Sequence, residues 1–435
     1  MTPYPEYKAT NLPWLPQIPA HWELVRNKNV LKEQKDTVGK YSSQYTLLSL
    51  TLCGIIPRDM ENCKGKFPAE FDNYKIVRCS DIVFCLFDID ETPRAVGLSG
   101  YSGMITGAYD VFSITNVNPR FLYYYYLNID NQKAFKPYYT GLRKVVNIAR
   151  FLSLQFPIPS VAEQEQIVLY LDSMTAKINK LIRAKKKICD LIFEEILLLA
   201  NEHIDNANLP RYRLKNVIKL VGDQIIREDE TLYTPIGVLN RGRGVFHKQQ
   251  LLGKDLGDSE FFNVSPGDMI FSGQFAWEGA VAILQDTERG CIASHRYPLA
   301  RAINPELLKL EYLWAFFQTK YGDMLLNIHS HGAAGRNRPL NIVRLLSEAI
   351  PIPPLEEQKK IERLFLQLKE AKELAAKYSS QLQEYKNSLI ASVVTGQVDV
   401  RNIQVEEFDP ADLITETDDD PAEDDDQPQE ESEVE

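Results

Sequence analysis

The feature that most constrains the fold of this chain is a phrase that occurs twice, as PIPSVAEQEQI from Pro157 and as PIPPLEEQKKI from Pro351. The match extends upstream in the same register, where GLRKVVNIARFLSLQF from Gly141 aligns with GRNRPLNIVRLLSEAI from Gly335. A period of roughly 200 residues is too long for a solenoid repeat. We therefore interpret the chain as a globular domain with an attached helix, present twice.

The segments between the repeats are typical of strand-rich domains. They are short, rich in β-branched and aromatic residues, and separated by glycines, as in YTLLSL, DIVFCLF and YDVFSI. Asn-Pro pairs at Asn118 and Asn304 predict the start of one helix in each copy, because proline is favoured at the first helical position. We expect the four tyrosines that follow Asn118 to pack against a sheet rather than to stack on bases.

A long helix is predicted after each repeated phrase. The prolines favour an extended chain, and the following acidic residues suit a helix N-terminus. Apolar residues then recur at alternating spacings of four and three, which is typical of a coiled coil. The first helix has Ile167, Leu171, Met174, Ile178, Leu181, Ile188 and Ile192, and the second has Ile361, Phe365, Leu368, Ala375, Leu382 and Leu389. We expect the two helices to form one pseudosymmetric pair.

The formal charge of -11 hides two unlike regions. Residues 405–435 contain 16 acidic residues and no lysine or arginine, so the preceding residues carry a charge of +5. The acidic end has too few apolar groups to fold, and we expect it to be a disordered tail, whose role is either to confer solubility or to compete with DNA for the basic body.

Composition also limits the class of protein. With 44% hydrophobic residues over 435 positions, the chain can form two domains of about 150 to 200 residues. No apolar run reaches the roughly 18 residues that span a bilayer, and no signal follows Met1, so we expect a cytoplasmic protein. The six cysteines form no CxxC pair and are expected to be reduced and mostly buried.

Motifs for catalysis are missing from the sequence. There is no phosphate-binding loop, no dinucleotide fingerprint, no HExxH and no GxSxG. His329 and His331 lack a third ligand at metal-binding spacing, so neither a catalytic residue nor a metal site is predicted. The chain is interpreted as a binding protein.

Basic and polar side chains in glycine-containing loops are the candidate DNA contacts, since these residue types pair with phosphates and base edges. They cluster at equivalent places in the two copies, although for each residue taken singly ordinary surface charge remains an alternative. The candidates are Arg143, Lys144, Arg241, Arg243, His247, Lys248, His295, Arg296, Arg336, Asn337 and Arg338.

These motifs resemble a known family. The two proline-rich phrases, the N-terminal WLPQIPAHWEL and the closing SLIASVVTGQVDV are similar to the conserved regions of the specificity subunit of type I restriction-modification enzymes. The resemblance covers nearly all of the chain to about residue 401 and does not include the acidic tail.

The resemblance implies an α+β fold with two target recognition domains, separated by two long antiparallel coiled-coil helices in a pseudo-twofold arrangement. The expected parts are a first recognition domain at 1–156, a spacer helix at 157–205, a second recognition domain at 206–350, a spacer helix at 351–398 and the acidic tail at 399–435. Each recognition domain would read one half of a bipartite DNA target, and the helices would act as a ruler.

The resemblance also implies partners. Two methyltransferase subunits would bring S-adenosylmethionine, and restriction subunits would bring ATP and Mg²⁺, while this chain binds no cofactor. The residues assigned to docking and spacing are Pro157, Pro159, Glu163, Gln164, Pro351, Pro353, Glu357 and Gln358. Two alternatives remain: a protein-interaction scaffold of two β-rich domains on a coiled coil, and a nuclease active on its own, which the missing metal-carboxylate cluster disfavours.

Overall fold

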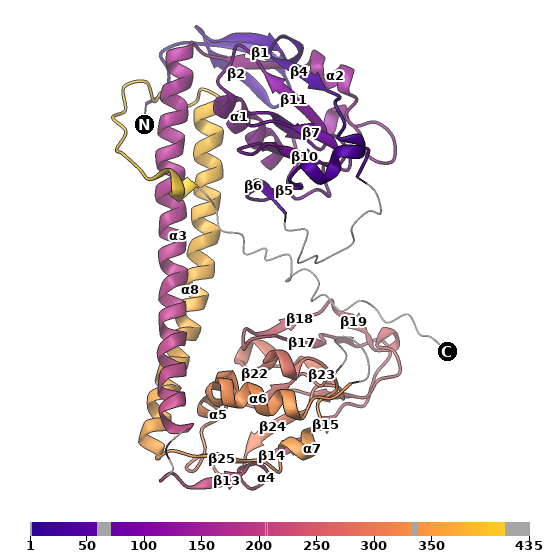
Figure 1. Ribbon diagram of the computed structural model, residues 1–435, viewed down its shortest axis with the longest axis vertical. Helices are drawn as coiled ribbons and strands as arrows, with labels where there is room; N and C mark the ends of the chain where they lie inside the picture. The colour runs from indigo at the N-terminus through magenta and orange to yellow at the C-terminus, as the bar shows by residue number, and fades with distance from the viewer. Residues whose placement is uncertain (1, 59–70, 205, 207, 333–337, 414–435) are drawn as a thin grey trace. The chain divides into compact units, whose positions relative to one another are not determined.

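The computed structural model describes residues 2–58, 71–204, 206, 208–332 and 338–413. The chain divides into two compact units, of which the first combines two segments that are distant in the sequence and the second is one continuous stretch. Unit 1 comprises Met1–Ala184 and Lys377–Glu435, and unit 2 comprises Lys185–Ala376. The two long helices α3 (Val161–Ile204) and α8 (Leu355–Val394) contribute to both units (Figure 1). Each unit therefore contains a strand-rich domain together with parts of both helices, which the predicted boundaries had separated.

Unit 1 is built from short strands and two further helices. Its elements are β1 (Tyr7–Leu12), β2 (Leu15–Pro19), β3 (Glu23–Arg26), β4 (Leu31–Gln34), β5 (Leu48–Thr51), β6 (Gly54–Pro57), β7 (Lys75–Val77), β8 (Ile82–Phe84), β9 (Val96–Leu98), β10 (Gly103–Ile105), β11 (Asp110–Ile114), α1 (Pro119–Asn131), α2 (Ile148–Ser153) and β12 (Gln155–Ile158).

Unit 2 follows a similar plan. Its elements are β13 (Arg211–Arg213), α4 (Leu214–Val217), β14 (Ile218–Val221), β15 (Asp223–Gln224), β16 (Leu232–Tyr233), β17 (Ile236–Leu239), β18 (Gly244–His247), β19 (Leu251–Leu252), β20 (Phe261–Asn263), β21 (Met269–Phe271), β22 (Val281–Ile283), β23 (Ile292–Ser294), β24 (Leu299–Ala302), α5 (Leu310–Gln318), α6 (Lys320–Ile328), α7 (Ile342–Leu345) and β25 (Ala349–Pro351).

The central sheets of the two units have the same topology. The four-stranded sheet of unit 1 has the order β4-β11-β8-β9, and that of unit 2 has the order β14-β24-β21-β22. In each sheet the first strand along the chain pairs with the last, which pairs with the second. The two-stranded sheet β12-β3 corresponds in the same way to β25-β13, and the hairpin β5-β6 corresponds to β17-β18. The repeated sequence thus folds into a repeated domain.

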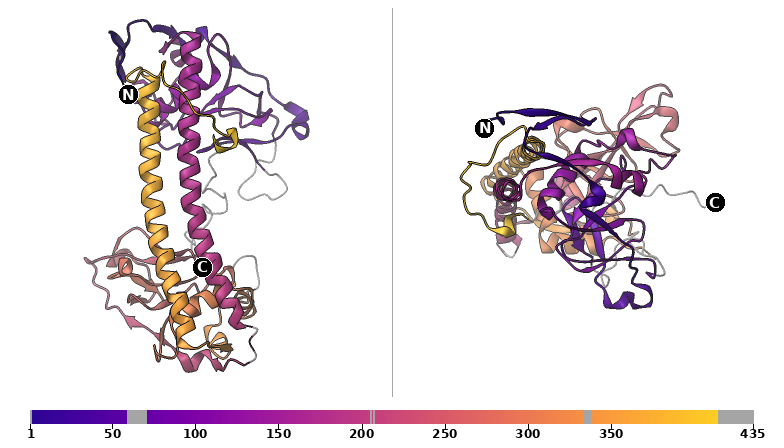
Figure 2. Two further views of the ribbon diagram at one scale, coloured as in Figure 1. Left: turned by 90° about the vertical axis from the view of Figure 1, so that its left-hand side faces the viewer. Right: turned by 90° about the horizontal axis from the view of Figure 1, so that it is seen from above.

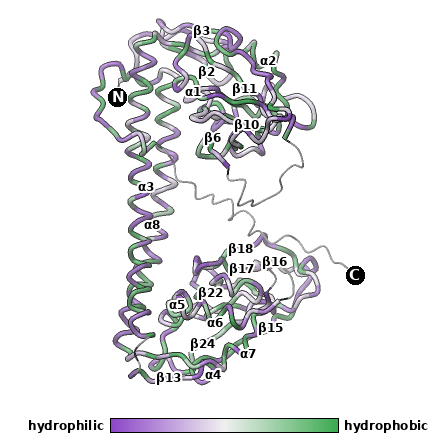
Figure 3. Tube along the Cα trace, viewed as in Figure 1, coloured by the Kyte–Doolittle hydropathy of each residue, from purple (hydrophilic) through white to green (hydrophobic). Residues whose placement is uncertain are grey.

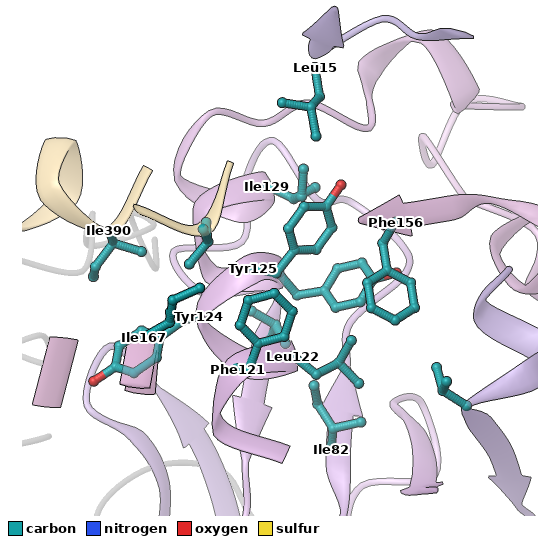
Figure 4. Packing of buried hydrophobic residues seen from close by; sticks show 14 of the residues in the cluster. Leu15, Ile82, Phe121, Leu122, Tyr124, Tyr125, Ile129, Phe156, Ile167 and Ile390 are labelled. Atoms are coloured by element: carbon teal, nitrogen blue, oxygen red, sulfur yellow. The ribbon is translucent and has the colours of Figure 1, made fainter. Parts of the chain in front are cut away.

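The helix predicted after Asn118 is confirmed. The Asn118 side chain caps α1 by accepting hydrogen bonds from the backbone N–H groups of Arg120 and Phe121, and Pro119 is its first residue. Tyr125 is 1% exposed and lies with Phe156 in the core of unit 1, where α1 covers the sheet (Figure 4). The expectation that these tyrosines pack in a core holds for Tyr124, Tyr125 and Tyr126, while Tyr123 is partly exposed.

The prediction that a helix starts directly after Asn304 is wrong. Asn304 begins a turn instead, in which its backbone C=O accepts from the N–H groups of Leu307 and Leu308. The helix α5 starts only at Leu310, because the backbone N–H of Lys309 is bound by the side chain of Gln358 at 2.8 Å. A side chain from a distant segment thus decides where this helix begins.

Within each unit, segments of α3 and α8 lie side by side (Figures 1 and 2). In unit 1 the Lys386 ammonium donates to the amide oxygen of Asn179 at 3.4 Å. In unit 2 the ring of Trp314 from α5 packs against both Phe193 of α3 and Phe365 of α8. The helices are therefore held to their domain as well as to each other.

The prediction of one continuous apolar stripe along the first helix is wrong for the middle of the helix. Leu181 and Ile188 are 52% and 53% exposed, whereas Ile178 and Ile196 are buried. Polar and apolar residues are interspersed along both helices (Figure 3). The stripe shifts because α3 packs against one domain in its first half and against the other in its second half, so no single heptad register describes its buried face.

The predicted disordered tail is wrong for residues 399–413, which we call the C-terminal strap. Val400 is fully buried in the core of unit 1, and the Gln166 side chain of α3 donates to the backbone C=O groups of Val400 and Ile403. Further along, Arg183 of α3 forms an ion pair with Asp412. Residues 414–435 lie outside the part of the chain that the structure describes. Apolar residues at 400, 403 and 405 thus fold the start of an otherwise acidic segment onto α3.

Within the described ranges, no helix combines the length and the apolarity needed to cross a membrane.

Candidate nucleic-acid interface

The repeated phrase places one glutamine at the same position in both units. The Gln164 amide group accepts from the backbone N–H of Asn118 at 2.8 Å and donates to the C=O of Pro159 at 2.9 Å. The Gln358 amide group accepts from the N–H of Lys309 at 2.8 Å and donates to the C=O groups of Leu307 and Pro353. Each glutamine therefore ties the start of a long helix to the segment in front of the domain helix.

The glutamate before each glutamine has different surroundings in the two units. Glu163 is buried and accepts hydrogen bonds from Tyr4, His21 and Trp22 of the N-terminal segment. Glu357 is partly exposed and forms an ion pair with Lys360, one turn further along α8. The N-terminal segment thus anchors on unit 1 through a carboxylate that the repeat supplies.

Most of the residues assigned to docking and spacing are buried within the chain. Gln164 is 1% exposed and Gln358 is 0% exposed, and their amide groups are engaged inside the chain. Pro157, Pro159, Pro351 and Pro353 are also buried. These residues form the junction between strand and helix, which suits the spacer role assigned to them, and their docking role stays a prediction. Glu357 alone of the eight keeps a partly exposed side chain.

In unit 2, predicted DNA contacts gather around the short helix η5 (Ala276–Glu278). The guanidinium of Arg338 lies over the ring of Trp277, with 4.5 Å between its central carbon and the ring centroid. Arg241 lies nearby, since its backbone N–H donates to the C=O of Glu278, and its side chain is exposed. Arg241 has a left-handed backbone with φ of 51°, followed by Gly242 at 63°. This tight turn of the β17–β18 hairpin holds the arginine at the surface.

A second group of cations lies on the loop between β23 and β24. Arg296 and His295 are exposed, and the Arg296 C=O accepts from the N–H of Gly273. Burial lowers the pKa of Lys248, and the positive charge of Arg296 lowers it further. Gly273 in turn accepts from the N–H of Leu340, two residues after Arg338. This network of hydrogen bonds brings the loop and Arg338 into one neighbourhood.

The remaining candidates of unit 2 are less available. Arg243 is partly buried and donates to the backbone and side-chain oxygens of Asn240. His247 lies 3.4 Å from the buried carboxylate of Glu288. Arg336 and Asn337 lie outside the described residues.

In unit 1, the predicted contacts Arg143 and Lys144 lie against an acidic loop. The Arg143 guanidinium donates to Asp88 at 3.1 Å and lies over the ring of Phe87. The Lys144 ammonium lies 3.6 Å from Asp90 and 3.4 Å from Glu91. Exposed ion pairs of this kind contribute about 0–1 kcal/mol, so a competing anion can replace them.

Lys144 and Arg338 occupy equivalent positions in the repeated domain. Two residues after each of them, the N–H of Val146 donates to Leu86 and the N–H of Leu340 donates to Gly273, both at 2.8 Å. Leu86 and Gly273 each lie two residues past the second strand of their sheet. The same backbone frame therefore presents a cation in both units, next to Asp90 in one and to Trp277 in the other.

Trp277 and the acidic loop 88–91 are the elements that the sequence reasoning missed. Neither Trp277 nor the loop 88–91 lies in the repeated phrase. The loop that contains Trp277 and the loop 88–91 carry different residue types at matched positions. The signal that could have found them is the pair DIVF and DMIF, which sets the register for both loops.

Among the described residues, no group of three histidine, cysteine, aspartate or glutamate side chains is arranged to hold a metal ion. His329 lies 2.8 Å from the carboxylate of Glu348, while His331 is exposed.

Two copies of one α+β domain, joined by long helices and presenting cations on loops of unlike chemistry, define a duplicated binding protein. The model of the type I restriction modification DNA specificity domain matches residues 103–188 and 211–384, and the chain belongs to this family.

A curated relative and two solved structures are similar over most of the chain. The putative type I restriction enzyme MjaX specificity subunit of Methanocaldococcus jannaschii is 22% identical over 88% of this chain and 95% of its own length. A chain solved in work on complex assembly and conformational transition of the type I R-M system has a TM-score of 0.55 at 15% identity, covering 88% of this chain and 99% of that one. The HsdS subunit from Thermoanaerobacter tengcongensis has a TM-score of 0.42 at 15% identity, over 88% and 98%.

Proposed function

We propose that the chain is the DNA-recognition subunit of a type I restriction-modification complex. The observation that carries the proposal is the matched pair Lys144 and Arg338, which the same backbone frame presents in two unlike surroundings. Cations on surface loops suit phosphates and guanine edges, and differing neighbours suit two readers of different sequence. Membership of the family supports the same function.

The target in this proposal is bipartite. Each unit reads one group of bases, and the two long helices set the number of unread base pairs between the groups. The 44 residues of α3 and the 40 residues of α8 correspond to about 66 and 60 Å of helix at 1.5 Å per residue. Half-sites one turn apart are about 34 to 36 Å from centre to centre, so the helices are long enough for a ruler. Their pairing as an antiparallel coiled coil with pseudo-twofold symmetry belongs to the same proposal.

The partners in this proposal supply the chemistry. Two methyltransferase subunits bind the chain and bring S-adenosylmethionine, and restriction subunits bring ATP and Mg²⁺. This chain contributes recognition and spacing and performs no catalytic step. A pair of similar domains suits two copies of one partner, because equivalent surfaces recur on both.

Binding to mixed-sequence and target duplexes, measured for the chain with its methyltransferase partner at several salt concentrations, tests the proposal. We expect affinity to fall steeply with salt, since cations release counterions from the duplex. Arg338→Ala should weaken target binding by about 1–3 kcal/mol if the guanidinium contacts a base bidentately. If it contacts a phosphate, the variant should weaken binding to all duplexes and reduce the salt slope by about one unit.

Arg289→Ala is a matched control, because Arg289 is also an exposed arginine of unit 2, and it pairs with Asp286 rather than lying over Trp277. It should leave target binding nearly unchanged. Retention that does not depend on salt, with Arg338→Ala equal to the control, would instead favour a protein-interaction scaffold.

A further inference from the structure

A cavity of about 560 Å³ lies inside unit 1, apart from the candidate nucleic-acid interface. Its walls come from α1, from the turn between β5 and β6, from the loop before β9, and from the parts of α3 and α8 that belong to unit 1. The charged side chains that line it are Arg94, Arg120, Asp130, Lys133 and Lys386. Its volume is in the range of small-molecule sites.

Two carboxylates neutralise part of the positive charge of this cavity. Asp130 is shared, since it accepts from Arg94 at 3.1 Å and from Lys133 at 2.8 Å. Asp172 accepts from Arg120 at 2.6 Å and also from the hydroxyl of Tyr124. Four cations therefore face two carboxylates, and the group has a positive excess.

The excess is carried by groups that are buried. Lys386 is 9% exposed, and its contact among the described residues is a hydrogen bond of 3.4 Å to the neutral amide of Asn179. A buried cation with only a long hydrogen bond to a neutral group is costly, and an anion in the same cavity would stabilise it. Burial and the charge of Arg94 lower the pKa of Lys386 to about 8, so its ammonium is still mostly charged at neutral pH.

We propose that this cavity binds an anionic group with closely spaced negative oxygens, held by the ammonium of Lys386 beside the positive charge of Arg94. Two sources have this chemistry. One is a free phosphate-bearing small molecule. The other is the acidic stretch of this chain, because Leu413 lines the cavity and Glu416, Asp418, Asp419 and Asp420 follow it within seven positions.

Calorimetric titration of the full chain with inorganic phosphate and with pyrophosphate tests the proposal. We expect binding of one or both, and we expect Lys386→Met to weaken it at least about tenfold, since hydrogen bonds to charged groups are strong. Lys386→Arg should retain most of the affinity. Lys377→Met, which removes an exposed lysine of the same helix, should have no effect.

A thermal unfolding series separates binding from a structural role. Lys386→Met should keep or raise the Tm of the anion-free protein, because it removes a buried charge, while abolishing the rise in Tm that pyrophosphate produces. A full-length variant with amides in place of the carboxylates at 416, 418, 419 and 420 distinguishes the two sources. If pyrophosphate binds this variant about tenfold more tightly than the wild type, the chain's own acidic residues are the natural occupant. Equal affinity identifies a free ligand. No binding to either protein, or binding that Lys386→Met leaves intact, would overturn the proposal.

Discussion

At the scale of single residues, the two glutamines of the repeat have the clearest energetic role. Each satisfies a backbone N–H and one or two backbone C=O groups that the fold removes from water. A buried polar group left without a partner costs about 1–3 kcal/mol, so a side chain that serves several such groups is hard to replace. This requirement explains why the same residue type stands at the same place in both copies.

We therefore predict that Gln358→Ala lowers the free energy of unfolding by about 2–4 kcal/mol, because it leaves the backbone groups of Leu307, Lys309 and Pro353 unpaired. Chemical denaturation followed by circular dichroism measures the loss. Glu357→Gln, one residue away and partly exposed, should change stability by less than about 1 kcal/mol. Equal stability of the two variants would contradict the assigned role.

The candidate binding residues were predictable by type and by loop but not by partner. Arg143, Lys144 and Arg338 could be chosen because cations lie near glycines in an aligned repeat. Their neighbours Asp88, Asp90 and Trp277 come from another loop, and only the folded sheet brings the two loops together. The burial of Gln164 and Gln358 could not be predicted from the sequence either, because a polar residue at a helix start is usually solvated.

At the scale of elements, local signals placed α1 and both long helices, and tertiary contacts decided the exceptions. The Asn-Pro signal gave α1, whose cap is local, but failed for α5, where Gln358 binds the backbone of Lys309. The heptad pattern predicted both long helices and misplaced Leu181 and Ile188, because α3 changes the domain against which it packs. The expected tail began at residue 399, ahead of the acidic run at 405–435, and the buried Val400 fixes its first part on unit 1.

The end of α8 depends on one glycine. Gly396 has a left-handed backbone with φ of 74°, and a Cβ there would lie 2.3 Å from Cδ of Pro19 and 3.4 Å from the ring of Trp22. Its C=O also accepts from the hydroxyl of Tyr7. The turn after α8 thus fits against the N-terminal strands only if this residue has no side chain.

Gly396→Ala should therefore lower the free energy of unfolding by about 3 kcal/mol, through backbone strain and a clash with the ring of Pro19. The matched control is Gly39→Ala, because Gly39 has φ of 50° but no atom within 4 Å of the added methyl group. The control should cost about 1–2 kcal/mol from backbone strain alone. A difference between the two variants of less than about 0.5 kcal/mol would show that the contact with Pro19 does not matter.

At the scale of the whole molecule, one fold is used twice and its surfaces differ. The strand order and the glutamine junctions are shared, whereas the loops next to Lys144 and Arg338 carry an acidic residue in one copy and an aromatic residue in the other. The duplication could be predicted from the sequence because junction residues repeat in strict register. The chemical difference of the two surfaces could be expected only in outline, because divergent loops do not align.

The central claim is that the helices set the gap between two groups of bases, and shortening them tests it. Removing 185–188 from α3 and 373–376 from α8 takes out four residues at facing positions, since Cys189 interacts with Lys372. Four residues turn an α-helix by about 400°, which is about 40° beyond a full turn, and one base pair turns the duplex by about 34–36°. The rotation of the helices therefore corresponds to about one base pair, and their shortening by about 6 Å corresponds to nearly two at about 3.4 Å per base pair.

The measurement is single-molecule sequencing of methylated adenines in cells that carry this chain with the proposed methyltransferase partner. For the wild type we predict two fixed groups of bases separated by a fixed number of unread positions. For the shortened chain we predict the same bases with a gap that is shorter by one or two. An unchanged gap with altered bases, or a single continuous target in the wild type, would contradict the account.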